Sequence, residues 1–295
     1  MPSKHPLWLV LAPFIFLVLW AGGYVVAKIG LQFASPMVLL SMRFAAVVAI
    51  MTVLFAVLRP PLPKTKADWG HLAFVGFLVQ TVYFGIAYLA FVNGVAAGTA
   101  AVIMALQPIL VALIAPRWSG EKISWKQWAG LIVALMGAIA VILSRLEIGP
   151  PPVLGFVYCV IALLGITLAT LWEKRFGLSH HPVTANLIGY TAGLLGLLPL
   201  LFYQGIEPIA WTWTFVAAFA YLVIGNSVIA VGLLLAMIRV GEVSKVSAML
   251  FLVPPLTAFI AWLLLGEIMP PVAWGGIVVA GLGVWLATRK QQQSK

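Results

Sequence analysis

The sequence predicts an all-α polytopic membrane protein, with ten transmembrane helices arranged as two inverted-topology repeats of five. Three observations favour this fold class: the composition, the spacing of the apolar runs, and an internal repeat. The 295 residues are 63% hydrophobic and 8% charged, whereas a soluble domain carries about 25% charged residues. A chain with so few charges could not cover its apolar surface in water, so we expect a lipid bilayer around it.

Ten apolar runs are each long enough to cross a bilayer as a helix, which takes about 20 residues. The first run continues past Trp20 without a cleavage site and is expected to remain as a helix rather than act as a signal peptide. In chain order, the expected spans are 8–29, 37–58, 70–92, 97–116, 126–144, 153–172, 184–203, 213–237, 244–265 and 271–288.

The breaks between these runs hold nearly all the charge. The second span ends at RPPLPKTKAD, the fourth at RWSGEKISWK, the fifth at SRLEIGPP and the sixth at EKRFGLSHHP. The third and fourth spans are separated only by a short uncharged break at 93–98, and the eighth and ninth by a short charged one at 238–245. Polar breaks between apolar runs indicate loops outside the bilayer.

The basic residues fall mainly on one side of the expected membrane. With ten spans, 14 of the 17 Lys and Arg residues lie on the side of both termini, and only Lys28 and Arg145 lie opposite; Arg43 falls within the second span. Because cytoplasmic loops are enriched in Lys and Arg, we expect a multi-pass protein of the cell (inner) membrane with both termini in the cytoplasm. The net charge of +10 is then a topology signal, and nucleic-acid binding is not expected.

An internal repeat relates the two halves at an offset of 146 residues. Between 108–137 and 254–283, 12 of 30 positions are identical, where composition alone would give about one in ten. The halves are therefore expected at 1–148 and 149–295, each with five spans. An odd number of spans inverts the second half, and such repeats place a substrate site near the bilayer midplane. An inverted repeat without a transport role remains the alternative.

Two stretches of sequence resemble the signatures of a known family. LWAGGYVVAKIGLQFASPMVLLSMRF (19–44) is similar to the opening of an EamA repeat. PILVALIAPRWSGEKISWKQWAGLIVALMG and PPLTAFIAWLLLGEIMPPVAWGGIVVAGLG are similar to its closing signature. The whole chain thus resembles the ten-helix EamA branch of the drug/metabolite transporter (DMT) superfamily, and most closely its YddG-type exporters of aromatic and neutral amino acids.

The resemblance implies a secondary transporter that exports amino acids by alternating access and has a small-molecule substrate. The second half departs from the first at two positions, with Ile166 and Gly189 where Trp20 and Arg43 would be repeated. We therefore expect an asymmetric site. An exporter of drugs or other amphiphilic metabolites is the alternative within the class. A sugar-phosphate carrier would need several central cations, which the sequence does not provide.

Polar and aromatic residues near the span centres are the candidate substrate-binding residues. Gln80 maps onto Asn226 at the repeat offset, and an amide in hydrocarbon costs several kcal/mol unless it is paired. These two amides form either a pair across a central cavity or an interhelical hydrogen bond. The other candidates share an aromatic or polar side chain on the first, third, fourth or sixth span: Trp20, Tyr24, Tyr83, Tyr88, Gln107, Thr170 and Trp172. Such a cavity suits a neutral substrate with a hydrophobic side chain, although each aromatic alone is compatible with the core.

Two cations and two prolines complete the candidate residues. Lys28 and Arg43 could pair with a substrate carboxylate, although Lys28 is also placed to snorkel to the headgroups. Pro108 and Pro254 occupy equivalent positions in the repeats. Each could bend its helix during opening and closing, or form a static kink that shapes the cavity.

The seven acidic residues all lie in loops or near span ends, whereas proton-coupled pumps usually carry an intramembrane carboxylate. Transport down the substrate gradient, or coupling through a group the sequence does not reveal, is therefore expected. Glu121 and Glu267 are expected to stand at helix starts, where the helix dipole favours them.

The sequence offers no sign of catalysis or of a bound cofactor. Cys159 is the one cysteine, and no metal-ligand spacing or catalytic constellation occurs. We expect no metal, no cofactor and no enzyme activity, and a membrane scaffold is the remaining alternative outside transport. The sequence leaves the oligomeric state open, and a monomer is compatible with it.

Overall fold

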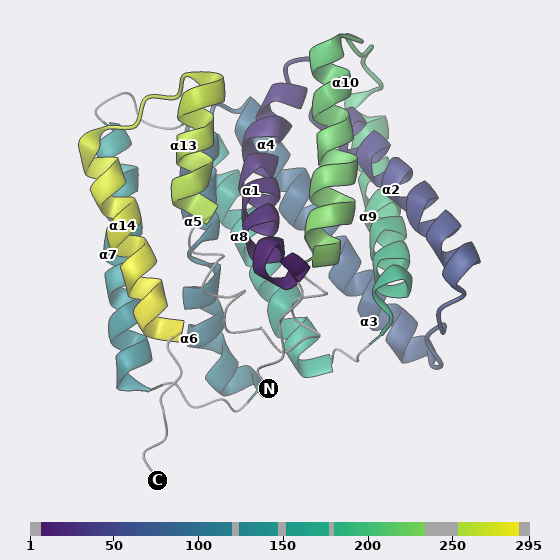
Figure 1. Cartoon of the computed structure of the whole chain (residues 1–295), viewed down its shortest axis with the longest axis horizontal. Helices are drawn as coiled ribbons and strands as arrows, with labels where there is room; N and C mark the ends of the chain where they lie inside the picture. Colours follow the sequence, from purple (N-terminus) through teal and green to yellow (C-terminus); the bar gives the residue numbers. More distant parts are fainter. Residues whose placement is uncertain (1–6, 120–123, 147–151, 177–179, 234–252, 289–295) are drawn as a thin grey trace.

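The computed structural model describes residues 7–119, 124–146, 152–176, 180–233 and 253–288, and these residues form helices without any strand (Figure 1). Seven helical stretches in the described chain are long and apolar enough to cross a membrane. Three further apolar helices are shorter: Trp125–Val141, Leu256–Leu265 and Pro271–Ala287. The all-α membrane class expected from the sequence is thus confirmed, and the count of ten spans stays a prediction.

The first half of the chain gives five successive helical rods. Three of them are single helices, and the other two are built from several segments. In chain order they are α1 (Leu7–Gly30), α2 (Pro36–Leu58), α3 (Lys66–Gly76) with η1 (Phe77–Gly85) and α4 (Ile86–Val92), α5 (Ala97–Met104) with α6 (Gln107–Ser119), and α7 (Trp125–Leu146).

The second half repeats this order. Its helices are α8 (Val153–Phe176), α9 (Pro182–Gln204), α10 (Trp213–Ala220) with η2 (Tyr221–Ala230), α13 (Val253–Leu265) and α14 (Pro271–Thr288). The end of the expected span 213–237 and the start of the expected span 244–265 lie outside the described residues.

The helix limits follow the repeat offset found in the sequence. α2 and α9 begin 146 residues apart and end 146 residues apart, and so do α1 and α8. In both halves the third rod contains a π-helical segment, η1 or η2. π-helical turns are rare and often mark functional sites, so η1 and η2 are candidates for positioning the functional site.

Glycines pack α7 and α14 side by side at one edge of the bundle (Figure 1). Gly130 contacts Gly283, and Gly137 contacts Gly276; a methyl group on Gly276 would lie 2.8 Å from the Gly137 carbonyl oxygen. Adding 146 to Gly130 and Gly137 of α7 gives Gly276 and Gly283 of α14, so each contact joins one glycine to the repeat counterpart of the other. Contacts in this reversed order mean that α7 and α14 run antiparallel.

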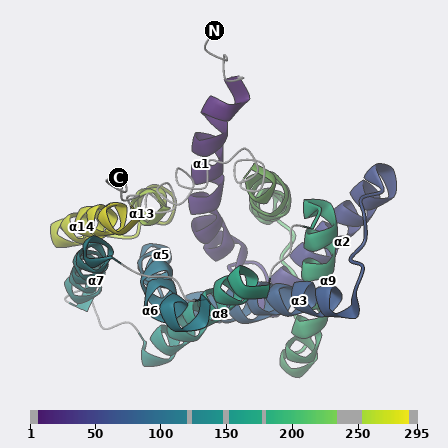
Figure 2. The ribbon, with the colours of Figure 1, turned by 90° about the horizontal axis from the view of Figure 1, so that it is seen from below.

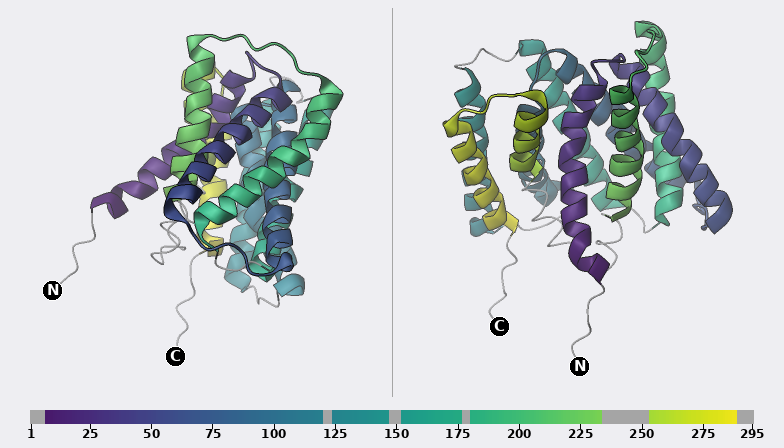
Figure 3. Two further views of the ribbon diagram at one scale, coloured as in Figure 1. Left: turned by 90° about the vertical axis from the view of Figure 1, so that its right-hand side faces the viewer. Right: turned by 45° about the horizontal axis from the view of Figure 1, so that its top comes forward.

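α1 lies between α13 and the green helix α10, and its first turns project away from the other helices (Figure 2). α2 and α9, the second helix of each half, cross and pack against each other (Figure 3). α1 begins and α14 ends at the same end of the molecule (Figure 1). The largest hydrophobic cluster joins α1, α2, η1 and α4 to α8 and η2.

The fourth rod is interrupted near the first of the two matched prolines. α5 ends at Met104, and α6 begins at Gln107, so Pro108 occupies the first turn of a new helix. A proline there loses no helical hydrogen bond. Pro254 is the second described residue of α13, and the residues before Val253, which would show whether it lies mid-helix, are outside the described ranges.

Candidate functional site

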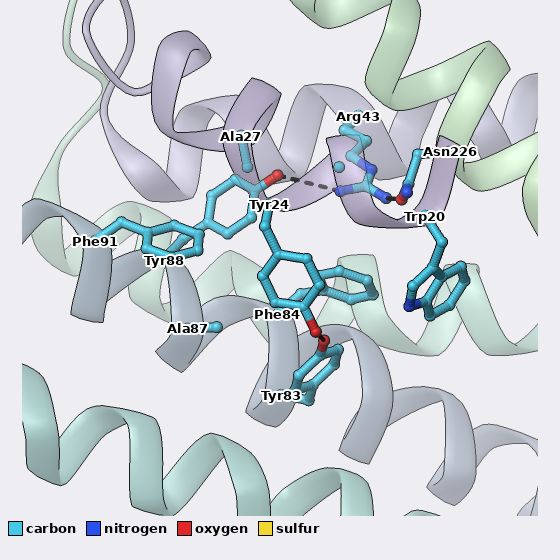
Figure 4. Close-up of a pocket in the computed structure, with 11 residues that line it drawn as sticks. Trp20, Tyr24, Ala27, Arg43, Tyr83, Phe84, Ala87, Tyr88, Phe91 and Asn226 are labelled. Carbon is cyan, nitrogen blue, oxygen red and sulfur yellow. Dashed lines mark hydrogen bonds between the residues drawn. The ribbon is translucent and has the colours of Figure 1, made fainter. Parts of the chain in front are cut away.

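A small pocket lies at the centre of the molecule between α1, α2, the η1–α4 rod and η2 (Figure 4). Its lining is largely aromatic, with one cation and one amide: Trp20, Gly23, Tyr24, Ala27, Arg43, Tyr83, Phe84, Ala87, Tyr88, Phe91 and Asn226. Its free volume is about 20 Å³, roughly the space of one water molecule. This space is too small for an amino acid, so a substrate must move some of the lining side chains to enter.

Arg43 on α2 is the most deeply buried charge in the pocket, with 1% of its side chain exposed. Its Nε donates to Ser227 Oγ at 3.0 Å, and its two terminal nitrogens donate to Tyr88 Oη at 3.1 Å and Asn226 Oδ1 at 2.7 Å (Figure 4). The guanidinium carbon lies 4.8 Å from the Phe84 ring centroid. Every one of these partners is neutral.

Asn226 is itself held in place by the opposite half of the chain. Its Nδ2 donates to the Leu19 carbonyl of α1 at 3.1 Å, which turns its Oδ1 toward Arg43. Gly23 makes room for this contact, since a methyl group there would lie 3.0 Å from Asn226 Cγ. The guanidinium is thus fixed by groups from η1, α4 and η2 before any ligand binds.

The pocket contains no acidic side chain from the described parts of the chain. Asp68 caps α3 through Thr65, and Glu267 is paired with Lys28. A buried cation that has only neutral partners remains undercompensated, because burying a charge is costly unless it is paired. The pocket therefore favours a ligand with an anionic group.

Aromatic side chains form the remaining walls. The Tyr24 and Tyr83 hydroxyls hydrogen-bond each other across the pocket at 2.9 Å, joining α1 to η1 (Figure 4). Phe84 packs on Tyr83 at 4.7 Å between ring centroids, and Tyr88 packs on Phe91 at 6.1 Å. These walls suit a large apolar or aromatic group beside the cation.

Gln80, the counterpart of Asn226 in the first half, does not line the pocket. It is buried on η1 against Gly193 of α9, and its Oε1 has no hydrogen-bond partner among the described residues. The expected pair of amides across a central cavity is therefore wrong. The second half carries Gly189 in place of Arg43, packed against Gly76 of α3, so no guanidinium draws Gln80 inward.

Three other candidates form contacts between helices away from the pocket. Gln107 Nε2 donates to Thr170 Oγ1 at 2.7 Å, joining α6 to α8. Trp172 Nε1 donates to His71 Nδ1 at 3.2 Å, within an aromatic cluster that includes Phe176. Gln107 and Thr170, both predicted to bind substrate, therefore contact each other but do not line the pocket.

Lys28 has a partner that the sequence did not indicate. Its Nζ lies 2.8 Å from Glu267 Oε1, and the same oxygen accepts from the backbone N–H of Ala97 at 3.1 Å. Snorkelling alone does not describe Lys28, which ties α1 to the α13–α14 loop. Glu267 thus accepts from the first residue of α5, and its expected place at the start of the helix that follows it stays a prediction. Glu121 lies outside the described residues.

The sequence reasoning missed several lining residues. These are Gly23, Ala27, Ala87 and Phe91, which carry no polar group. Ser227, the partner of Arg43 Nε, was missed as well. Helical spacing could have found three of them, because Ala27, Ala87 and Phe91 follow the predicted Tyr24, Tyr83 and Tyr88 by three, four and three residues. Small residues on that face provide the room between the aromatic walls.

A larger open pocket of about 680 Å³ lies where α1 and α4 end and α2 begins. Gln32, Asn93, Tyr158 and Glu207 are among its lining residues. α4 contributes to both pockets, with Tyr88 lining the central one and Leu89 the open one. Within the described ranges, no group of three His, Cys, Asp or Glu side chains is placed to hold a metal ion.

Known proteins similar to this chain are transporters. A "Probable amino-acid metabolite efflux pump" of Salmonella typhimurium is 24% identical over 283 residues, covering 92% of each chain. A "Probable terminal-alkyne amino-acid exporter" of Streptantibioticus cattleyicolor is 30% identical over 209 residues, covering 66% of this chain and 65% of its own. One crystal structure shares the fold with a TM-score of 0.67 at 16% identity, covering 96% of this chain and 97% of its own. The EamA-like transporter family matches residues 6–143 and 153–289. The chain therefore belongs to the EamA-like transporter family.

Proposed function

We propose that this transporter exports amino acids, chiefly large neutral and aromatic ones, by alternating access through the central pocket. The observation that carries the proposal is Arg43, a buried guanidinium with neutral partners in a pocket walled by aromatic rings. A carboxylate can take two parallel hydrogen bonds from a guanidinium, and an apolar side chain can rest on the rings. Large neutral amino acids combine these two features.

The names of similar proteins support the same substrate class. Relatives from Salmonella typhimurium and Streptantibioticus cattleyicolor are named as an amino-acid metabolite efflux pump and an amino-acid exporter. The aromatic walls would also suit a hydrophobic drug. The buried cation favours a substrate with an anionic group, which an amino acid has and an uncharged or cationic drug lacks.

Alternating access follows from an inverted repeat of 1–148 and 149–295. The equal spacing of helix limits and the reciprocal glycine contacts of α7 and α14 support this arrangement. The pocket lies between the halves, with Trp20, Tyr24, Arg43, Tyr83 and Tyr88 from the first half and Asn226 from the second. One half rocking against the other would expose this pocket to either side.

The orientation of the chain decides which pocket faces outward, while the substrate gradient drives export. The excess of Lys and Arg on the side of the termini favours a cytoplasmic position for α1's start and α14's end. The open pocket near Gln32 and Glu207 then faces outward and provides an exit. The break before Pro108, between α5 and α6, is the proposed bending point of the first half.

Transport in this proposal follows the substrate gradient, because no described acidic side chain lines the pocket to carry a proton. The test uses purified protein in liposomes and a panel of labelled amino acids, with and without a pH gradient. We expect saturable flux of phenylalanine, tryptophan and leucine that is insensitive to the pH gradient. Absence of saturable amino-acid flux would refute the substrate class, and dependence on the pH gradient would refute the uncoupled mechanism.

A further inference from the structure

The central pocket offers one half of the chemistry that recognises a zwitterion. Arg43 supplies a cation for the carboxylate, but no described acidic side chain lines the pocket to receive an α-ammonium group. Of the described acids, Asp68 and Glu267 are engaged elsewhere, by Thr65 and by Lys28. The three acids outside the described ranges, Glu121, Glu147 and Glu242, follow or precede apolar spans in the sequence.

The neutral groups of the pocket are poor substitutes for an acid. The Tyr24 and Tyr83 hydroxyls already bond each other at 2.9 Å, and Tyr88 and Asn226 accept from Arg43. Ring faces can hold an ammonium by cation–π attraction, but more weakly than a carboxylate does. An ammonium on the carbon next to the carboxylate would also stand close to the guanidinium, where like charges repel.

From this imbalance we infer that the pocket recognises aromatic carboxylates, and that it accepts arylalkanoates that lack the amino group at least as well as the amino acids. The inference rests on the proposed function and names its substrate class more closely. A carboxylate without the amine loses the hydration of one charge, and the hydrogen bonds from Arg43 replace that hydration. An amino acid loses hydration at a second charge as well, with no acidic partner to replace it.

A consequence separates the two substrate types by charge. An amino acid carries no net charge across the membrane, whereas an arylalkanoate carries one negative charge. Arg43 returns with the empty carrier, so the substrate's own charge is the net charge moved. With the interior negative, the membrane potential favours outward movement of the anion by about 50-fold at equilibrium per 100 mV.

The test compares three ligands that share one phenylethyl skeleton: L-phenylalanine, 3-phenylpropanoate and phenethylamine. Isothermal titration calorimetry on the purified full-length protein measures the Kd of each. We expect 3-phenylpropanoate to bind as tightly as phenylalanine or more tightly, and phenethylamine to bind at least tenfold more weakly than either. Arg43→Gln should remove the preference for the carboxylate, while Arg117→Gln, at an exposed position of α6, should keep it.

The outcomes distinguish this inference from the proposed function. Phenylalanine binding without 3-phenylpropanoate binding would overturn the inference and leave the amino-acid exporter standing. The reverse result would support the inference and overturn the amino-acid substrate. If neither compound binds, both are wrong.

A second measurement uses liposomes and a potassium–valinomycin potential. An interior-negative potential should accelerate efflux of labelled 3-phenylpropanoate beyond that from protein-free liposomes and leave phenylalanine efflux unchanged. An equal response of both substrates would contradict the inference.

Discussion

Replacing Arg43 by glutamine should weaken amino-acid binding strongly while leaving the protein folded. Glutamine keeps a planar amide near Asn226 and Tyr88 but removes the positive charge, which in the wild type has only neutral partners. Removing the charge also removes its desolvation penalty, which offsets the hydrogen bonds that Ser227, Tyr88 and Asn226 lose. The thermal midpoint of Arg43→Gln should therefore stay close to that of the wild type.

The expected loss of affinity follows from the hydrogen bonds that a carboxylate would receive. A hydrogen bond to a charged group contributes about 1.5–3 kcal/mol, and about 1.4 kcal/mol is a factor of ten in Kd. Arg43→Gln should therefore raise the Kd for phenylalanine roughly 10- to 150-fold. Arg43→Lys keeps the charge but loses the planar fork, so its Kd should fall between those of the wild type and Arg43→Gln.

Scintillation proximity binding of tritiated phenylalanine to purified protein measures these constants. Arg117→Gln is the matched control, since it makes the same change of charge at an exposed position of α6. It should bind within twofold of the wild type. If folded Arg43→Gln, monodisperse on size exclusion, also binds within twofold of the wild type, then Arg43 is not the carboxylate anchor.

Three further outcomes test other parts of the account. Gly276→Ala should lower thermal stability by about 1–3 kcal/mol, because the added methyl meets the Gly137 carbonyl at 2.8 Å; Gly275→Ala, with open space around it, should not, and equal effects would contradict the packing. Glu267→Gln and Lys28→Gln should each cost about 1 kcal/mol in thermal unfolding, and the double variant should cost less than their sum; full additivity would exclude the pair. Tyr83→Phe removes the 2.9 Å hydroxyl bond but keeps the ring, so it should lower stability by about 1 kcal/mol and change the phenylalanine Kd by less than threefold. A tenfold change would make that hydroxyl a direct ligand.

The sequence predicted the membrane class and the buried position of Arg43, because both depend on the pattern of apolar residues along the chain. Arg43 lies several residues inside an apolar run, and a charge at that depth needs an interior partner. Asn226 was expected in the interior for the same reason, and both line the pocket. One-dimensional hydropathy is sufficient for such inferences.

The sequence did not predict which way a side chain points when that direction depends on the other half of the chain. Gln80 shares its repeat position with Asn226, yet it lies against Gly193 of α9, because the second half has no counterpart of Arg43. The π-helical segment η1 also changes the periodicity that a 3.6-residue helix would give to Gln80 and Tyr83.

The pairing of Lys28 with Glu267 escaped prediction for a related reason. The two residues are 239 positions apart, and their repeat counterparts do not mark them as partners. Only the packing of α1 beside α13 brings the end of the first helix to the loop after α13.

The most direct test of the account is a structure of the transporter with bound L-phenylalanine. We expect the carboxylate about 3 Å from the Arg43 guanidinium nitrogens, and the phenyl ring among Trp20, Tyr24 and Phe84 in an opened central pocket. Phenylalanine bound elsewhere, or bound there with its carboxylate turned away from Arg43, would contradict it.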